Sequence, residues 1–87
     1  MSKRGDFVFI NKSFDGGNNI CGKKVAEFRK SMKKSQRQLA DALQLLGLDV
    51  DKNAIQRIEA GKRFVTDIEI VFLCKALNIT VNELLGI

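Results

Sequence analysis

The segment Asn53–Arg63, NAIQRIEAGKR, decides the fold of this chain. An earlier helical pattern, SQRQLADAL, precedes it and begins at Ser35. Apolar residues recur in both segments at helical spacing. Gly61 lies near the end of the Asn53–Arg63 segment, and Gly is the residue that commonly ends a helix in a left-handed conformation. The two segments therefore predict two consecutive helices joined by a turn. The later of these two helices, which is the third of the chain, carries Lys52, Asn53, Gln56 and Arg57 along its outward side.

Three further helices are predicted around this pair. Residues 21–32 repeat apolar side chains at the spacing of one helix face. A capping box, in which Ser or Thr and a later Gln or Glu satisfy the first amides of a helix, occurs three times. The boxes are Ser35–Gln38, Thr66–Glu69 and Thr80–Glu83. With Asp51 as the N-cap of the third helix, the sequence predicts an all-α domain of five short helices.

The same spacing predicts which side chains face the core. The inward positions of the second helix are Leu39, Ala40, Leu43 and Leu46. Those of the third helix are Ala54, Ile55 and Ile58.

Residues 1–20 differ from the rest and are predicted to form an N-terminal arm, with the helical domain at residues 21–87. Gly and Asn interrupt this stretch rather than build helices. Three of the six Phe nevertheless lie in it, at Phe7, Phe9 and Phe14. Their concentration predicts that the arm docks either on its own domain or on a second subunit.

Charge is unevenly distributed along the chain. The 87 residues carry a net charge of +5, and residues 21–40 hold seven Lys or Arg against one Glu. Residues 41–60 hold two basic and four acidic groups. One end of a single domain is therefore strongly basic, which suits nucleic acid or an anionic surface, although a solvated soluble face has the same composition.

Several classes of function lack the residues they need. The chain has no His, and Cys21 and Cys74 lie far apart, so we expect no metal site. It has no phosphate-binding Gly loop and no nucleophile beside a base, so we expect no enzyme, cofactor or small-molecule substrate. Apolar runs fall short of the ~20 residues of a membrane span. Two Cys in apolar helical settings favour buried thiols and a cytoplasmic location.

Four segments occur in an order that is distinctive as a set. They are Lys24-Val25 with Phe28-Arg29-Lys30, Ser35-Gln36 with Leu39-Ala40, Ile55 with Ile58-Glu59 and Gly61-Lys62-Arg63, and the closing run Leu77 to Leu85. Together they resemble the Cro/phage-repressor helix-turn-helix family over residues 22–86. The resemblance implies a compact lambda-repressor-like domain in which the helix at residues 52–60 reads DNA.

Three features depart from the family pattern. The connection from Leu39 to Ile55 is longer than usual, so we expect the second helix to run one extra turn. Lys33 and Lys34 stand where the family favours Gly and an apolar residue. Residues 1–20 have no counterpart in the minimal family domain. None of these departures changes the expected fold.

The resemblance also implies roles for particular side chains. Base contacts in the major groove fall to Lys52, Asn53, Gln56 and Arg57. The chemistry agrees, because Arg bonds guanine O6 and N7 together, and Asn or Gln pairs with adenine. Phosphate contacts fall to Gln36, Arg37, Lys62 and Arg63. Glu59 is expected to form a partly buried structural ion pair with Arg29.

The leading interpretation is a transcriptional regulator, a repressor by preference, that binds a double-stranded operator as a homodimer. Three dimer surfaces remain open: the last helix with Ile87, the Phe64-Val65 exit and the Phe-rich arm. The alternative is a protein-interaction module or antitoxin component with little DNA specificity. The longer connection, the acidic Asp49 and the arm favour that alternative.

Overall fold

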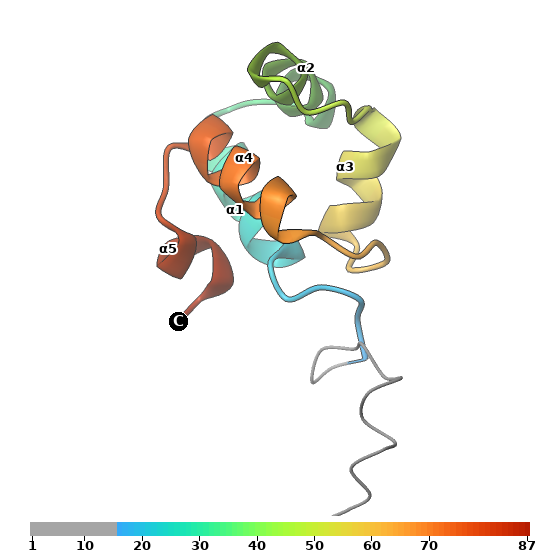
Figure 1. Ribbon diagram of the computed structural model, residues 1–87, viewed down its shortest axis with the longest axis vertical. Helices are drawn as coiled ribbons and strands as arrows, with labels where there is room; N and C mark the ends of the chain where they lie inside the picture. Colours follow the sequence, from blue (N-terminus) through green and yellow to red (C-terminus); the bar gives the residue numbers. More distant parts are fainter. Residues whose placement is uncertain (1–15) are drawn as a thin grey trace, which may run out of the picture.

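The computed structural model describes residues 16–87, which form five α-helices and no strand (Figure 1). The helices are α1 (Gly22–Ser31), α2 (Gln36–Leu46), α3 (Lys52–Glu59), α4 (Asp67–Leu77) and α5 (Val81–Leu85). The prediction of an all-α, five-helix domain is confirmed. The three Phe of the predicted arm lie outside the described residues, so the arm and its boundary with the domain stay predictions.

The helices begin where the sequence pattern predicts. Ser35 Oγ accepts the Gln38 amide at 3.0 Å, and Gln38 Oε1 accepts the Ser35 amide at 2.8 Å, which closes the first capping box. Equivalent pairs of hydrogen bonds start α4 and α5. Each cap satisfies amides that have no partner inside the helix and contributes about 1 kcal/mol.

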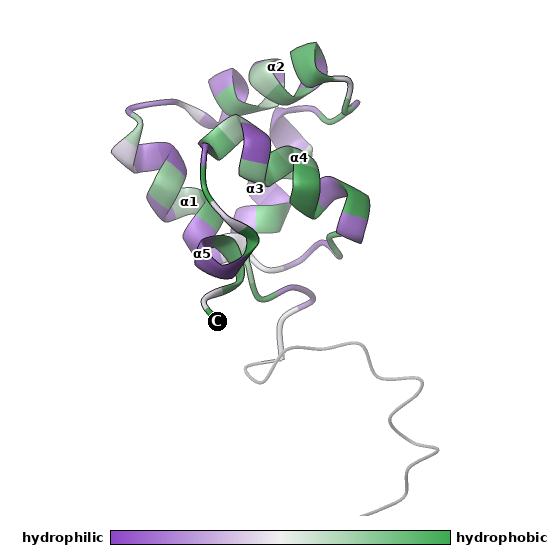
Figure 2. Cartoon of the chain, turned by 60° about the vertical axis from the view of Figure 1, so that its left-hand side comes forward, coloured by the Kyte–Doolittle hydropathy of each residue, from purple (hydrophilic) through white to green (hydrophobic). Residues whose placement is uncertain are grey.

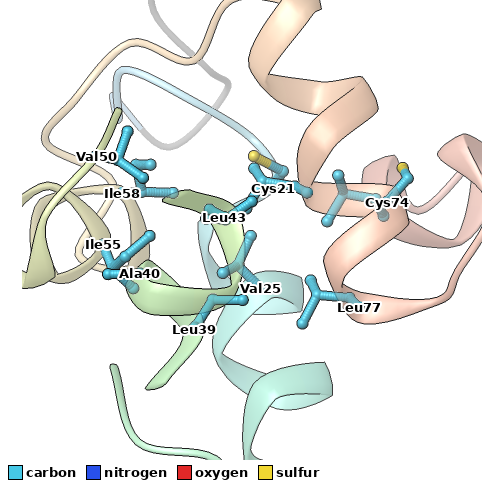
Figure 3. Close-up of a cluster of buried hydrophobic side chains, with 12 residues drawn as sticks. Cys21, Val25, Leu39, Ala40, Leu43, Val50, Ile55, Ile58, Cys74 and Leu77 are labelled. Atoms are coloured by element: carbon cyan, nitrogen blue, oxygen red, sulfur yellow. The ribbon is translucent and has the colours of Figure 1, made fainter. Parts of the chain in front are cut away.

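The core lies where α1 to α4 meet, and Figure 3 shows side chains from these helices converging on one centre. Val25, Leu39 and Ile55 have no exposed surface, and Leu84 brings α5 to the same cluster. Burial of one such side chain contributes about 1.5–3 kcal/mol, so these contacts set the arrangement of the helices.

One predicted inward position is wrong. Leu46 was expected in the buried stripe of α2, but it is 45% exposed, and Leu45 before it is 89% exposed. The buried side chains of α2 end at Leu43, and the last turn extends past them to Gly47, whose φ of 107° ends the helix. Helical spacing predicts the correct face, but it does not predict where along that face the neighbouring helices stop.

The connection between α2 and α3 is fixed to α2. The Leu48 amide donates to the Leu43 carbonyl at 2.9 Å, and the Gln44 side-chain amide donates to the Val50 carbonyl at 2.6 Å. Val50 itself is 5% exposed and packs in the core. The longer connection is therefore an ordered link that holds the start of α3 against the end of α2.

Asn18 and Asn19, in the part of the chain that the sequence assigns to the arm, bond to the end of α3 and to the loop that follows it. The Asn18 backbone amide donates to the Gly61 carbonyl at 2.8 Å. The Asn19 side-chain amide donates to the carbonyls of Ile58 at 3.1 Å and Arg63 at 2.8 Å. Asn18 and Asn19 thus tie the start of the domain to the end of α3 and to the loop that follows it.

Candidate nucleic-acid interface

The outward side of α3 presents the four side chains predicted to contact bases. Lys52, Asn53, Gln56 and Arg57 are all exposed. On the opposite side Ile55 and Ile58 are 0% and 2% exposed and anchor the helix in the core. The helix runs along the right-hand side of the molecule in Figure 1.

The acidic residues near the start of α3 differ in orientation. Asp51 turns toward the backbone, where its Oδ1 accepts the Ala54 amide at 2.8 Å. Its negative charge therefore lies at the positive end of the helix dipole, which compensates part of it. Asp49 is exposed, two residues before the cap. Asp51 is exposed as well, so both carboxylates can repel phosphate, and the helix dipole compensates part of the charge of Asp51 alone.

An ion pair between α1 and α3 fixes the orientation of the exposed helix. Arg29 Nε lies 2.7 Å from Glu59 Oε2, and Arg29 Nη2 lies 3.0 Å from Glu59 Oε1. The two side chains are 11% and 8% exposed. The hydrogen bond to Glu59 raises the pKa of the Arg29 guanidinium. Arg29 and Glu59 therefore form the ion pair that the sequence analysis expected, and Glu59 lies one turn after Gln56 on α3.

Gln36 joins the same network. Its side-chain amide donates to Glu59 Oε1 at 3.0 Å, and the side chain is half-buried. Arg29 Nη1 also donates to the Lys34 carbonyl at 2.8 Å, which links the network to the turn before α2. Gln36 was predicted to contact phosphate, and here it connects the first turn of α2 to the end of α3.

Arg63 has a partner that the sequence analysis did not identify. Its Nη1 and Nη2 atoms each lie 2.9 Å from an oxygen of Glu69. The hydrogen bond to Arg63 lowers the pKa of Glu69, and the same bond raises that of Arg63. Glu69 was assigned only to a capping box, and it serves both functions because one of its oxygens also accepts the Thr66 amide at 2.9 Å.

Arg37 and Lys62, the other two residues predicted to contact phosphate, are exposed, and the salt bridges of the described residues do not include them. Arg37 lies in the first turn of α2, which carries no acidic residue. Lys62 lies in the loop that follows α3, and its own backbone carbonyl accepts the Asn18 side-chain amide at 2.9 Å. The two exposed cations therefore lie on separate elements, Arg37 on α2 and Lys62 in the loop after α3.

Asn18 and Asn19, just before α1, bond to the end of α3 and the loop after it, and the sequence did not predict this role. Besides its two bonds to carbonyls, Asn19 accepts the Gly22 amide at 2.8 Å, so one side chain joins the start of α1 to the end of α3. The only sequence signal was the pair of Asn before a helix, which reads equally well as a flexible loop.

The remaining polar chemistry of the described residues is sparse. Cys21 and Cys74 are free and buried, and burial raises the pKa of the Cys21 thiol to about 11. No group of three His, Cys, Asp or Glu within residues 16–87 is arranged to hold a metal ion. No helix in this part of the chain is long and apolar enough to cross a membrane.

Comparison with known proteins agrees with this geometry. A family model described as helix-turn-helix matches residues 25–84. No curated protein sequence matches the chain. Among solved structures, the restriction-modification controller protein C.AhdI from Aeromonas hydrophila is similar, with 30% identity and a TM-score of 0.64 over 72% of this chain and 88% of that one. The chain therefore belongs to the helix-turn-helix family of DNA-binding regulators.

Proposed function

We propose that this protein is a sequence-specific transcriptional regulator that reads the major groove with the exposed side of α3. The observation that carries the proposal is the polarity of α3, which has four exposed polar side chains on one side and two buried Ile on the other. The Arg29–Glu59 ion pair supports it further, because a reading helix needs a fixed orientation.

The four side chains suit different bases. Arg57 can donate two hydrogen bonds to guanine, while Asn53 and Gln56 match the donor and acceptor pair of adenine. Each good bidentate contact discriminates against the wrong base by about 1–3 kcal/mol. Lys52, at the first position of α3, suits guanine or a nearby phosphate. Arg57 is the side chain from which we expect the largest share of the discrimination.

The cations around α3 fall into two groups. Arg37 and Lys62 are exposed and suit phosphate directly. Gln36 and Arg63 already bond to Glu59 and Glu69, so a phosphate contact from either would have to share these partners. We therefore propose that Arg37 and Lys62 contribute most of the phosphate binding, and that Gln36 and Arg63 contribute less.

Repression from a symmetric operator is the form of regulation that we propose. A single module of this kind offers little area, so two copies reading half-sites about 34–36 Å apart are the usual solution. The similarity to a controller protein supports a regulatory role. We propose that the protein exerts this role in the cytoplasm. A reporter gene carrying the operator should be repressed by the wild-type protein.

Alanine substitutions test the proposal by separating base contacts from phosphate contacts. Asn53→Ala should relax the base preference at one position of a selected site and cost about 1–3 kcal/mol of binding free energy. Asn82→Ala, an exposed Asn on α5, is the matched control and should leave binding unchanged. Lys62→Ala should weaken binding to every duplex alike and reduce the salt slope by about one. Equal effects of Asn53→Ala on all sequences would contradict base reading by α3.

A further inference from the structure

α4 carries an apolar stripe that faces away from the core. Ile68 and Val71 are 63% and 48% exposed. Phe72, which is partly buried against the core, continues the same line at helical spacing. Lys75 ends the line, with its Nζ 5.8 Å from the centroid of the Phe72 ring. The buried residues of the helix, Leu73, Cys74 and Leu77, lie on the opposite side. Figure 2 shows α4 as apolar over most of its length.

Such a helix differs from the others of the domain. A surface helix normally has one apolar side and one polar side, and a helix that is apolar all round is normally covered on both sides. Contiguous exposed apolar patches mark interaction sites more often than single exposed residues do. Phe64, just before α4, is also 50% exposed. The stripe therefore has the properties of a surface that is covered in the functional assembly.

We propose that the occupant is α4 of a second copy of this chain, packed antiparallel across a two-fold axis near Val71 and Phe72. The inference rests on the homodimer proposed above and assigns its interface. A two-fold interface requires one patch that is complementary to itself. The charges at the two ends of α4 meet this requirement.

The exposed Asp67 begins α4, and the exposed Lys75 lies near its end. In an antiparallel pair centred on Val71, each Asp67 lies at the same level as the partner's Lys75, so opposite charges meet twice. The helix dipoles also oppose each other in this arrangement, which is favourable. A parallel pair would place Asp67 beside Asp67 and Lys75 beside Lys75. Charge thus selects the antiparallel arrangement.

The stripe is separate from the DNA-reading side. In Figure 1, α4 crosses the front of the molecule, and α3 forms its right-hand side. Pairing through α4 therefore leaves α3 of each copy exposed. Four side chains supply only part of the about 800 Å² per partner that a standard interface buries. We therefore expect a concentration-dependent dimer that operator DNA stabilises.

Analytical ultracentrifugation of the full chain tests the interface with two matched substitutions. Val71→Glu places two carboxylates near the proposed axis and should raise the dissociation constant of the dimer at least tenfold. Val81→Glu makes the same change on α5, where Val81 is 42% exposed, and should leave the dimer intact. A dimer that tolerates Val71→Glu, or a wild-type chain that stays monomeric even on operator DNA, would overturn the proposal.

A charge exchange tests the antiparallel arrangement. Asp67→Lys and Lys75→Asp should each weaken the dimer severalfold, and the double substitution should recover most of the loss. Failure of the double substitution to recover any affinity would rule out this pairing. Circular dichroism of each variant separates loss of the interface from loss of the fold.

A duplex that holds one half-site separates this inference from the proposed function. Monomeric Val71→Glu should keep the base preference of the wild type on a half-site, because α3 is unchanged. Retained preference with a lost dimer supports both proposals. Loss of preference by a folded Val71→Glu monomer would mean that α4 affects DNA reading itself, which contradicts its assignment to the dimer interface alone.

Discussion

Gly22 lies where α1 approaches the end of α3 most closely. A Cβ atom at this position would lie against the Ile58 carbonyl oxygen, well inside van der Waals distance, and close to the Asn19 side chain. Because that oxygen belongs to the backbone, the two helices would have to move apart. The residue is therefore needed for the close packing of α1 against the end of α3, the helix that we propose reads DNA.

We expect Gly22→Ala to lower the free energy of unfolding by roughly 1–3 kcal/mol, the usual cost of overpacking a tight contact. Urea denaturation measures the change. Lys23→Ala, at the exposed neighbouring position, is the control and should have an effect below about 0.5 kcal/mol. Equal stability of Gly22→Ala and the wild type would show that α1 and α3 are not packed this closely.

The buried thiol of Cys21 makes stability depend on alkaline pH. Burial raises its pKa from 9.0 to about 11, so the folded state keeps the proton that the unfolded chain loses first. The contribution of the protonated thiol to the free energy of unfolding is fully present below about pH 9. The free energy of unfolding should fall by roughly 1–3 kcal/mol between about pH 9 and 11. Denaturation across this range measures the fall. Cys21→Ala should be less stable at neutral pH but show a smaller alkaline decline, and an unchanged decline would contradict the assignment to Cys21.

Whether a side-chain ion pair could be predicted from the sequence depended on how far apart its two residues lie in the chain and on whether both match a known family pattern. The pairing of Arg29 with Glu59, thirty positions apart, was expected only because both match a known family pattern. The pairing of Arg63 with Glu69 spans a loop and had no such precedent, so Arg63 was assigned to phosphate. The four polar residues of α3 followed from helical spacing, and their exposure agrees with it.

At the scale of the elements, the turn between α1 and α2 carries a strained residue. Lys33 has a φ of 58°, in the left-handed region that favours Gly, and its amide donates to the Lys30 carbonyl at 2.9 Å. This explains why the family favours Gly here. We expect Lys33→Gly to raise the free energy of unfolding by about 0.5–1 kcal/mol.

Lys34→Gly is the matched control for this substitution, because it removes the same charge at a position without positive φ. It should lower stability by about 0.5–1 kcal/mol through the greater freedom of the unfolded chain. Thermal or urea denaturation of both variants measures the difference. The same loss in the two variants would contradict a strained turn at Lys33.

The starts of the helices were predictable from sequence because capping is local. All three capping boxes join residues three positions apart, and each forms as expected. The bonds of Asn18 and Asn19 to the end of α3 span about forty positions, and no local pattern indicates them. The exposed end of α2, at Leu45 and Leu46, was missed for the same reason, since burial depends on where other helices end.

At the scale of the whole molecule, three surfaces have separate roles in this account. We propose that the polar side of α3 reads bases, that the exposed Arg37 and Lys62 bind phosphate, and that the stripe on α4 joins two copies. The net charge of +5 favours association with DNA at every sequence. Specificity must then come from α3, because general attraction to phosphate carries no sequence information.

The first two of these surfaces were predicted from the sequence, and the third was not. Ile68 and Val71 lie in a helix that reads as continuous apolar sequence, so periodicity could not separate its covered side from its exposed side. Only the packing of α4 on the core shows which side chains remain outside.

The most direct test of the central claim is fluorescence anisotropy of the purified protein on DNA selected from a random pool, measured across a salt series with wild type and Arg57→Ala. We expect a palindromic site that the wild type binds well above random DNA, with an affinity that falls steeply in salt. Arg57→Ala should lose most of that preference while keeping its weak binding to random duplexes. Equal, weak binding of the wild type to every duplex would contradict the account and favour a protein-interaction module on the same fold.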